Sequence, residues 1–148
     1  MGSRMTTIEV TRGRLIDHVE LVVADLGRSR RFYEAVLGAL GIPIAGEGPG
    51  SFWADELCVS VPESPDAAGE LTGRVHLAFQ AESREAVAAF HRAGLAAGGA
   101  DNGAPGERVY HRGYFAAFLL DPDGNNIEAV FHGPATRSSS AIVVTFPA

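Results

Sequence analysis

Apolar and polar side chains alternate along residues 15–23, as is typical of a β-strand that buries one face. One face carries Val19, Leu21 and Val23, and the other carries His18 and Glu20. The next stretch, residues 27–40, has apolar side chains at four-residue spacing, which predicts an amphipathic helix. Asp25 is placed to cap the start of this helix, and Gly41 is placed to end it.

Further short elements complete this first half of the chain. A glycine-rich turn is expected at residues 46–50, and two β-prone runs follow it at residues 52–54 and 57–61. The polar stretch 62–73 contains prolines and glycines and predicts a linker. The order is therefore strand, helix and further strands.

The second half repeats this order. Residues 74–80 alternate as a strand with His76 on its polar face, and a helix capped by Ser83 is expected over residues 85–97. An offset of 58 residues relates His18 to His76, Phe32 to Phe90 and Gly41 to Gly99. Two copies at this spacing favour a duplicated βαβββ unit over a solenoid.

A β-hairpin is predicted at the end of the second copy, because apolar runs flank the turn sequence DPDGN at residues 121–125. The second of these runs, NIEAVF, contains one acid, Glu128. An unpaired carboxylate in such a strand costs several kcal/mol, so Glu128 must be neutralised, hydrogen-bonded or bound to a metal. The insert before the hairpin, residues 100–112, is expected to form a loop at the rim of a site.

The predicted elements indicate one α+β domain at residues 14–132. It divides into a first module (14–62), a linker (63–73) and a second module (74–132). Residues 1–13 are interpreted as a tag remnant and lead-in, and residues 133–148 as a C-terminal tail. Within the tail, residues 142–146 are β-prone and could extend a sheet edge in this chain or in a partner.

Composition narrows the class of protein. Of 148 residues, 46% are hydrophobic, which suffices for the core of one domain. The net charge of -6 argues against nucleic acid as a partner. No apolar run approaches the roughly 20 residues that cross a bilayer, so we expect neither a membrane anchor nor a secretion signal. The single cysteine, Cys58, excludes an internal disulfide and favours a cytoplasmic location.

Two histidines and one carboxylate are the strongest candidates for chemistry. His18 and His76 occupy equivalent positions in the two copies, each as the polar group early in an apolar strand. Chance rarely places histidine at the same position of both copies. Together with Glu128 they match a 2-His-1-carboxylate metal site, which leaves coordination positions open for substrate and water.

The sequence resembles the vicinal oxygen chelate superfamily, which includes glyoxalase I, extradiol dioxygenases and bleomycin-resistance proteins. The resemblance lies in HVELVVADLGRSRRFYEAVLG, VHLAF and FLLDPDGNNIEAVFH. It implies two βαβββ modules that form a curved, partly open mixed β-barrel with the helices outside. It also implies one divalent metal ion, Fe, Mn, Ni or Zn, held by His18, His76 and Glu128.

The resemblance implies a metal-dependent lyase, isomerase or dioxygenase acting on a small substrate with two neighbouring oxygens. The alternative is a metal-free protein that sequesters a small molecule, as bleomycin-resistance proteins do, although the intact ligand set argues against it. Aligning the hairpins sets Cys58 opposite Glu128, so a fourth ligand from Cys58 or, after a register slip, from Glu56 stays open. The resemblance also favours a homodimer, whose modules pair within one chain or between two.

Other residues near the site are candidates for supporting roles. Tyr110, His111 and Tyr114 precede the final hairpin and could act as acids or hydrogen-bond donors to a chelated oxygen, or be ordinary rim residues. His91 is expected on a solvated helix face, and His132 is expected beyond the site.

Overall fold

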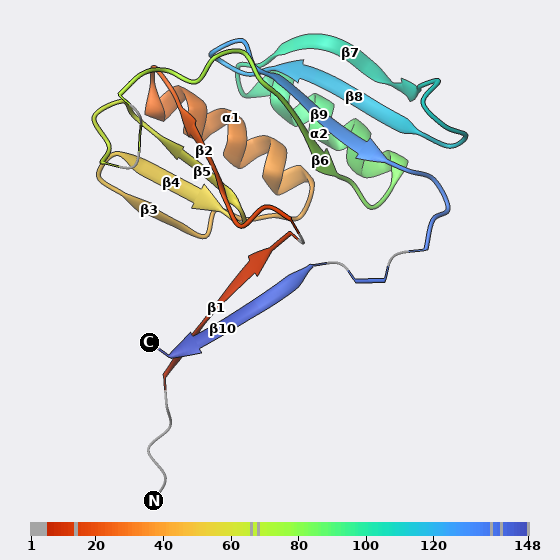
Figure 1. The fold of residues 1–148 in the computed structure, drawn as a ribbon. Coiled ribbons are helices and arrows are strands. Elements are labelled where there is room, and N and C mark those ends of the chain that lie inside the picture. The colour runs from red at the N-terminus through yellow and green to blue at the C-terminus, as the bar shows by residue number, and fades with distance from the viewer. Residues whose placement is uncertain are drawn as a thin grey trace, which may run out of the picture.

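The computed structural model describes residues 6–13, 15–65, 67, 69–136, 138–139 and 141–147. These residues form two βαβββ modules and a separate two-stranded ribbon (Figure 1). The elements are β1 (Thr7–Arg12), β2 (Val19–Val22), α1 (Leu26–Ala39), β3 (Gly46–Gly48), β4 (Ser51–Ala54), β5 (Leu57–Ser60), β6 (His76–Gln80), α2 (Arg84–Ala96), β7 (Ala100–Glu107), β8 (Phe115–Leu120), β9 (Asn126–Phe131) and β10 (Ile142–Pro147).

The first module is a four-stranded sheet with α1 on one face. Its strand order is β2-β5-β4-β3, with β2 parallel to β5 and the other pairs antiparallel. Asp25 caps α1 as predicted, because its side chain accepts a hydrogen bond from the Arg28 backbone N–H at 3.0 Å. The predicted burial of alternate strand positions is also confirmed, since Leu21 and Val23 lie in the core.

The second module repeats this architecture. Its order is β6-β9-β8-β7, again with one parallel pair, β6 and β9. Ser83 caps α2 by accepting a hydrogen bond from the Ala86 backbone N–H at 3.0 Å, as predicted. The duplication read from the sequence is therefore present in the fold. The two sheets are not closed into a barrel, so that part of the expected architecture is not shown.

The helices join the modules. Side chains of both modules form one hydrophobic core, and α1 packs against α2. A Cβ atom at Gly94 of α2 would lie 2.2 Å from Leu119 Cδ1 and 2.8 Å from Val36 Cγ1, so a glycine is needed where the helices meet. The opposite face of each sheet is turned away from the helices, and it carries the candidate site residues.

The predicted hairpin turn forms the second contact between the modules. Asp123 of this turn accepts a hydrogen bond from the Ala24 backbone N–H of the first module at 3.1 Å. Asn125 accepts one from the Val75 backbone N–H at 3.0 Å within the second module. Asp121 is buried and accepts hydrogen bonds from Tyr33 of α1 and from three N–H groups of its own turn. The DPDGN sequence thus has a structural role at the module joint.

Two predictions of loops were wrong. Residues 100–107 form β7 rather than a rim loop, and part of the expected turn at residues 46–50 forms β3. The sequence of β7, ADNGAPGE, lacks strand-forming residues, and the strand that it forms is irregular. Its register with β8 shifts on both sides of Gly103, whose φ of +152° falls in a region that favours glycine.

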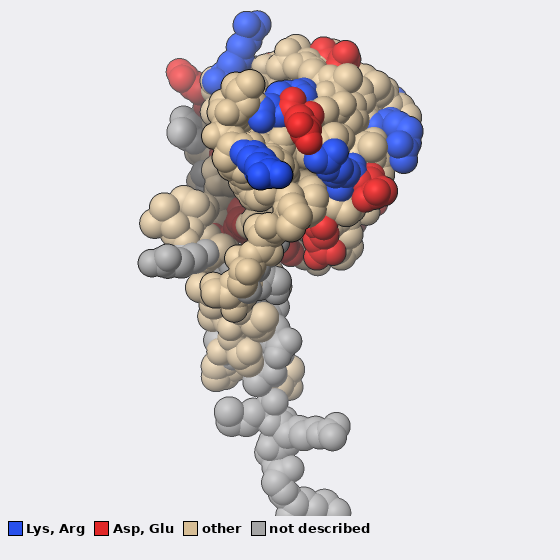
Figure 2. All heavy atoms as spheres, turned by 90° about the vertical axis from the view of Figure 1, so that its right-hand side faces the viewer, with Lys and Arg blue, Asp and Glu red and all other residues tan. Residues whose placement is uncertain are grey.

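The first and last strands of the described chain pair with each other. β1 and β10 form an antiparallel ribbon that projects away from the two modules (Figure 1). Figure 2 shows it as a narrow extension below a body on which acidic and basic side chains are interspersed. The β-prone run in the tail was predicted, whereas its partner strand was assigned to the lead-in. Residues 1–5, interpreted as part of a tag remnant, lie outside the described residues.

No helix within the described ranges is long and apolar enough to cross a membrane.

Candidate active site

Glu128 is the most deeply buried acid of the candidate site. Its exposed fraction is 2%, although it lies on the face of the second sheet that is turned away from α2. Its Oε1 atom lies 2.9 Å from Nε2 of His76. The two residues meet because β6 and β9 are parallel neighbours and Glu128 pairs with Ala78, two residues after His76 on the same face. The fold therefore brings together His76 and Glu128, two of the three residues predicted as metal ligands.

Tyr114 is the second partner of Glu128. Its hydroxyl group donates a short hydrogen bond to Glu128 Oε2, so both carboxylate oxygens have a neighbour. Burial, followed by the hydrogen bond to Glu128 and the charge of that carboxylate, raises the pKa of Tyr114 to about 12. Tyr114 is therefore a neutral donor at physiological pH.

His18 is not part of this cluster. Its Nδ1 atom lies 2.7 Å from Asp17 Oδ1, at the start of β2. The other end of β2 contacts the linker, where Val22 and Thr72 exchange hydrogen bonds. His18 lies on the face of the first sheet that also carries Glu20 and Cys58. Within the described part of one chain, no three histidine, cysteine, aspartate or glutamate side chains are grouped to hold a metal ion.

The two candidate ligand histidines are more exposed than the sequence indicates. Their strands were expected to be buried, but the side chains are 58% exposed at His18 and 52% exposed at His76. His18 precedes the first hydrogen-bonded residue of β2, and His76 is the first residue of β6. Both therefore sit at the end of a strand, where an imidazole remains accessible to a metal or a substrate.

A cluster of rings borders the buried carboxylate. His111 Nε2 lies 2.9 Å from His132 Nδ1, and both rings contact Tyr114, with centroid distances of 5.3 and 5.4 Å. The Tyr110 ring also packs on Tyr114, with a centroid distance of 4.9 Å, but Tyr110 remains 70% exposed. His132, which was expected beyond the site, contacts Tyr114 here, because the loop after β7 returns His111 to the end of β9.

The prediction about His91 was wrong. His91 was expected on a solvated face of α2, but its exposed fraction is 9% and its Nε2 atom lies 2.9 Å from Asp101 Oδ1. The hydrogen bond from His91, together with one from the Gly103 backbone N–H, lowers the pKa of Asp101. This pair connects α2 to β7 and therefore has a structural role.

Two of the three predicted metal ligands, His76 and Glu128, are in contact. A buried carboxylate and an imidazole nitrogen 2.9 Å apart are donor types that divalent first-row metals bind. Cys58 takes the position of Glu128 in the first module, since it pairs with Glu20 and Glu128 pairs with Ala78, 58 residues later. The first module thus lacks a carboxylate at this position, and its remaining candidate ligand is His18.

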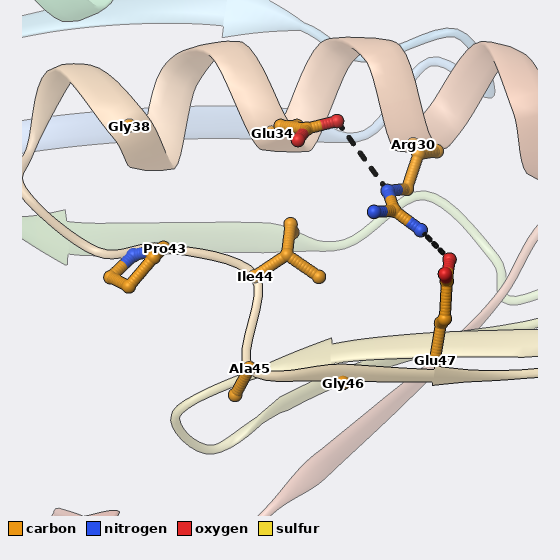
Figure 3. Close-up of a pocket in the computed structure, with 8 residues that line it drawn as sticks. All are labelled: Arg30, Glu34, Gly38, Pro43, Ile44, Ala45, Gly46 and Glu47. Atoms are coloured by element: carbon orange, nitrogen blue, oxygen red, sulfur yellow. Dashed lines mark hydrogen bonds and ion pairs between the residues drawn. The ribbon is translucent and has the colours of Figure 1, made fainter.

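A separate cavity of about 450 Å³ lies between α1 and the chain that enters β3 (Figure 3). At its polar end the Arg30 guanidinium lies between Glu34 and Glu47 and forms an ion pair with each. Pro43, Ile44 and Ala45 line the apolar side. The residues that line this cavity do not include His76, Tyr114 or Glu128, so it is separate from the candidate site.

Sequence comparison identifies the family. The profile of the Glyoxalase/Bleomycin resistance protein/Dioxygenase superfamily matches residues 15–129. The chain belongs to this superfamily. The match spans both modules and includes His18, His76 and Glu128. No match is found among curated protein sequences.

Solved structures agree with membership of this superfamily. A glyoxalase/bleomycin resistance protein from Albidiferax ferrireducens is 33% identical, with a TM-score of 0.67 over 78% of this chain and 97% of its own. A glyoxalase-related enzyme from Fulvimarina pelagi is 21% identical, with a TM-score of 0.67 over 91% of this chain and 99% of its own. A lactoylglutathione lyase from Agrobacterium tumefaciens is 20% identical, with a TM-score of 0.55 over 79% and 92% of the two chains. At the two lower identities the likeness shows the fold alone.

Proposed function

We propose that this glyoxalase-superfamily protein is a divalent-metal-dependent enzyme acting on a small substrate with two neighbouring oxygens. The observation that carries the proposal is the contact of the buried Glu128 carboxylate with His76 Nε2 at 2.9 Å. A carboxylate kept in an apolar strand needs a partner, and a divalent cation held jointly with an imidazole is a strong one. This contact also favours an enzyme over a metal-free binding protein.

We propose that His76 and Glu128 of one chain hold the metal together with His18 of a second copy. Parts of two modules are then needed for each site, and a homodimer would contain two sites. Unpaired outer edges at β2 and β6 suit such an arrangement, because each of these strands pairs with one other strand among the described residues. When bound, the metal would supply Lewis-acid polarisation of the substrate oxygens.

Tyr114 would position the carboxylate. Its hydroxyl group holds Glu128 Oε2, which leaves Oε1 directed at His76. Such hydrogen bonds to a ligand fix its orientation and tune its basicity. Because the phenol keeps its proton at physiological pH, Tyr114 acts as a donor rather than as a base. His111 and Tyr110 border Tyr114 and would limit access of water from that side.

The proposal covers two kinds of reaction that share chelation of neighbouring oxygens. One is a lyase or isomerase reaction, in which a proton moves at a carbon next to a chelated carbonyl. The other is a dioxygenase reaction, which requires a redox-active metal. The identity of the metal separates them, because Zn(II) has no redox chemistry and Fe(II) does.

Metal analysis of protein purified without chelator tests the proposed function. We expect about one equivalent of a divalent metal per chain, bound after purification or upon reconstitution. Glu128→Gln keeps the shape of the side chain and should release the metal, whereas Cys58→Ser serves as the matched control and should retain it. Less than about 0.1 equivalent in the wild-type protein after reconstitution would favour the metal-free binding protein instead.

A further inference from the structure

Arg108 lies on the same sheet face as Glu128. Its backbone N–H donates to the Tyr114 carbonyl oxygen at 2.9 Å, so the two residues face each other across β7 and β8 just beyond the last paired residues. Residues directly opposite in an antiparallel pair project to the same side. Tyr114 reaches Glu128 on that side, and the Arg108 side chain is directed to it as well.

The guanidinium group of Arg108 is held over Phe118. Its Cζ atom lies 5.4 Å from the centre of the Phe118 ring, and Phe118 pairs with Glu128 in the sheet. The ring of His76 also contacts Phe118, with a centroid distance of 6.0 Å. Arg108, Phe118, Glu128 and His76 therefore follow one another across β7, β8, β9 and β6 on one face.

Two glycines make room for this guanidinium. A Cβ atom would lie 3.0 Å from Arg108 Nη1 at Gly106 and 3.2 Å from Arg108 Nη2 at Gly103. Their register with Ala116 and Phe118 places both glycines on the same face as Arg108. Because β7 has no side chain at these two positions, the guanidinium group packs directly against its backbone.

The charge of Arg108 is not neutralised by a carboxylate of the described residues. Its hydrogen-bond acceptors are backbone carbonyls, since Nη2 donates to Ala104 O at 2.8 Å and Nη1 donates to Glu107 O at 3.3 Å. Arg84 provides a contrast, because it stacks on Phe115 at 4.7 Å and also binds the Glu107 carboxylate at 2.8 Å. Arg108 retains N–H donors and a full positive charge beside the site.

We propose that Arg108 binds a carboxylate of the substrate and so selects small carboxylic acids that carry two neighbouring oxygens. This inference rests on the proposed function, since it places those oxygens at Glu128 and His76. The planar guanidinium fork matches the two oxygens of a carboxylate. β7 and β9 are two strand spacings apart, about 10 Å, and Arg108 leans over Phe118 into that gap. The carboxylate and the oxygen pair are then separated by about three to six bonds of roughly 1.5 Å.

Arginine-side-chain NMR tests this binding directly. The protein is labelled with ¹⁵N-arginine. The Arg108 Nε–H resonance is assigned as the one that is lost in Arg108→Gln or, if that variant does not fold, in Arg108→Lys. Benzoate, 3,4-dihydroxybenzoate and catechol are then titrated at constant ionic strength. We expect both carboxylates to shift the Arg108 signal saturably and catechol to leave it in place. Arg84→Gln is the matched control, because Arg84 stacks on the same strand but faces the other side, and it should not change the titration.

Metal loading separates this inference from the proposed function. In metal-loaded protein, 3,4-dihydroxybenzoate should bind at least about tenfold more tightly than benzoate, and Arg108→Lys should weaken it by about tenfold. If the protein binds metal and neither carboxylate shifts Arg108 saturably, the Arg108 inference is wrong and the proposed function stands. If the carboxylates shift Arg108 in a protein that binds no metal, the proposed function is wrong and the anion site stands.

Discussion

The hydroxyl group of Tyr33 donates to Asp121 Oδ2 at 2.5 Å, and this bond links α1 of the first module to the β8–β9 turn of the second. Tyr33 is fully buried, and Asp121 has an exposed fraction of 5%. Burial and the nearby Asp121 carboxylate raise the pKa of Tyr33, so the phenol remains a donor. The bond therefore fixes how the two modules sit against each other.

Removing this hydroxyl group should destabilise the fold. Tyr33→Phe leaves a buried carboxylate with one donor fewer, and we expect the free energy of unfolding to fall by about 1–3 kcal/mol. Urea unfolding followed by circular dichroism measures the change. Tyr110→Phe is the control, because Tyr110 is 70% exposed and its loss of a hydroxyl group should leave stability unchanged. Equal effects of the two substitutions would contradict the role of Tyr33.

The helix contact at Gly94 gives a second prediction about stability. Gly94→Ala places a methyl group against Leu119 and Val36, both fully buried, and overpacking of this kind costs about 1–3 kcal/mol. Gly38→Ala in α1 meets no atom within 4 Å and should stabilise the protein by about 0.5–1 kcal/mol, because alanine favours the helix. Thermal unfolding of both variants should therefore move in opposite directions. A shift in the same direction would contradict the close approach of the helices at Gly94.

Stability at acidic pH should depend on Asp101. The pKa of this carboxyl group lies below its ordinary value of 3.8, mainly through the hydrogen bond from His91. A group with a lowered pKa in the folded state stabilises the fold above the unfolded value, and that contribution is lost as pH falls through the folded value. Asp101→Asn should therefore reduce the loss of stability on acidification below about pH 4. Parallel curves of unfolding free energy against pH for wild type and variant would be inconsistent with this assignment.

Mixing two variants tests whether each metal site is shared between chains. A His18→Ala chain and a Glu128→Ala chain are unfolded together, refolded and assayed for metal. With sites built from His18 of one chain and His76 and Glu128 of the other, a mixed dimer contains one intact site, so metal binding should return to about one quarter of the wild-type level for random pairing. Each variant alone is the control and should bind little metal. If the mixture recovers none while wild-type protein binds metal, the sites form within single chains or without His18.

Local signals made much of the fold predictable. The helices follow from apolar spacing and from the caps Asp25 and Ser83, which act within one turn of the chain. β7 was missed because its sequence has few strand-forming residues, and its strand conformation depends on pairing with β8. His91 was misplaced for a similar reason, since its partner Asp101 lies on another element. The Glu128–His76 contact was predictable because an acid in an apolar strand and a duplicated histidine are both visible in the sequence.

The location of His18 shows a different limit. Its position in the repeat was readable, but its place relative to His76 depends on how whole modules pack. That packing is decided by Tyr33, Gly94 and the residues of the β8–β9 turn, which contact each other only in the folded chain. A repeat in the sequence predicts which residues occupy equivalent positions in the two modules. It does not predict which of these residues come into contact when the modules pack.

The pairing of β1 with β10 brings the two ends of the described chain together, with Thr7 opposite Pro147. The two ends of the described chain are therefore close enough to be joined by a short connection. A circular permutant that joins these ends by a short turn and opens at residues 62–65 would carry the second module first. The ribbon would then become the hairpin that connects the modules, and the present linker would supply the new ends. Because the joint between modules is made by α1, α2 and the β8–β9 turn, the order of the two modules along the chain is exchangeable without changing how they pack.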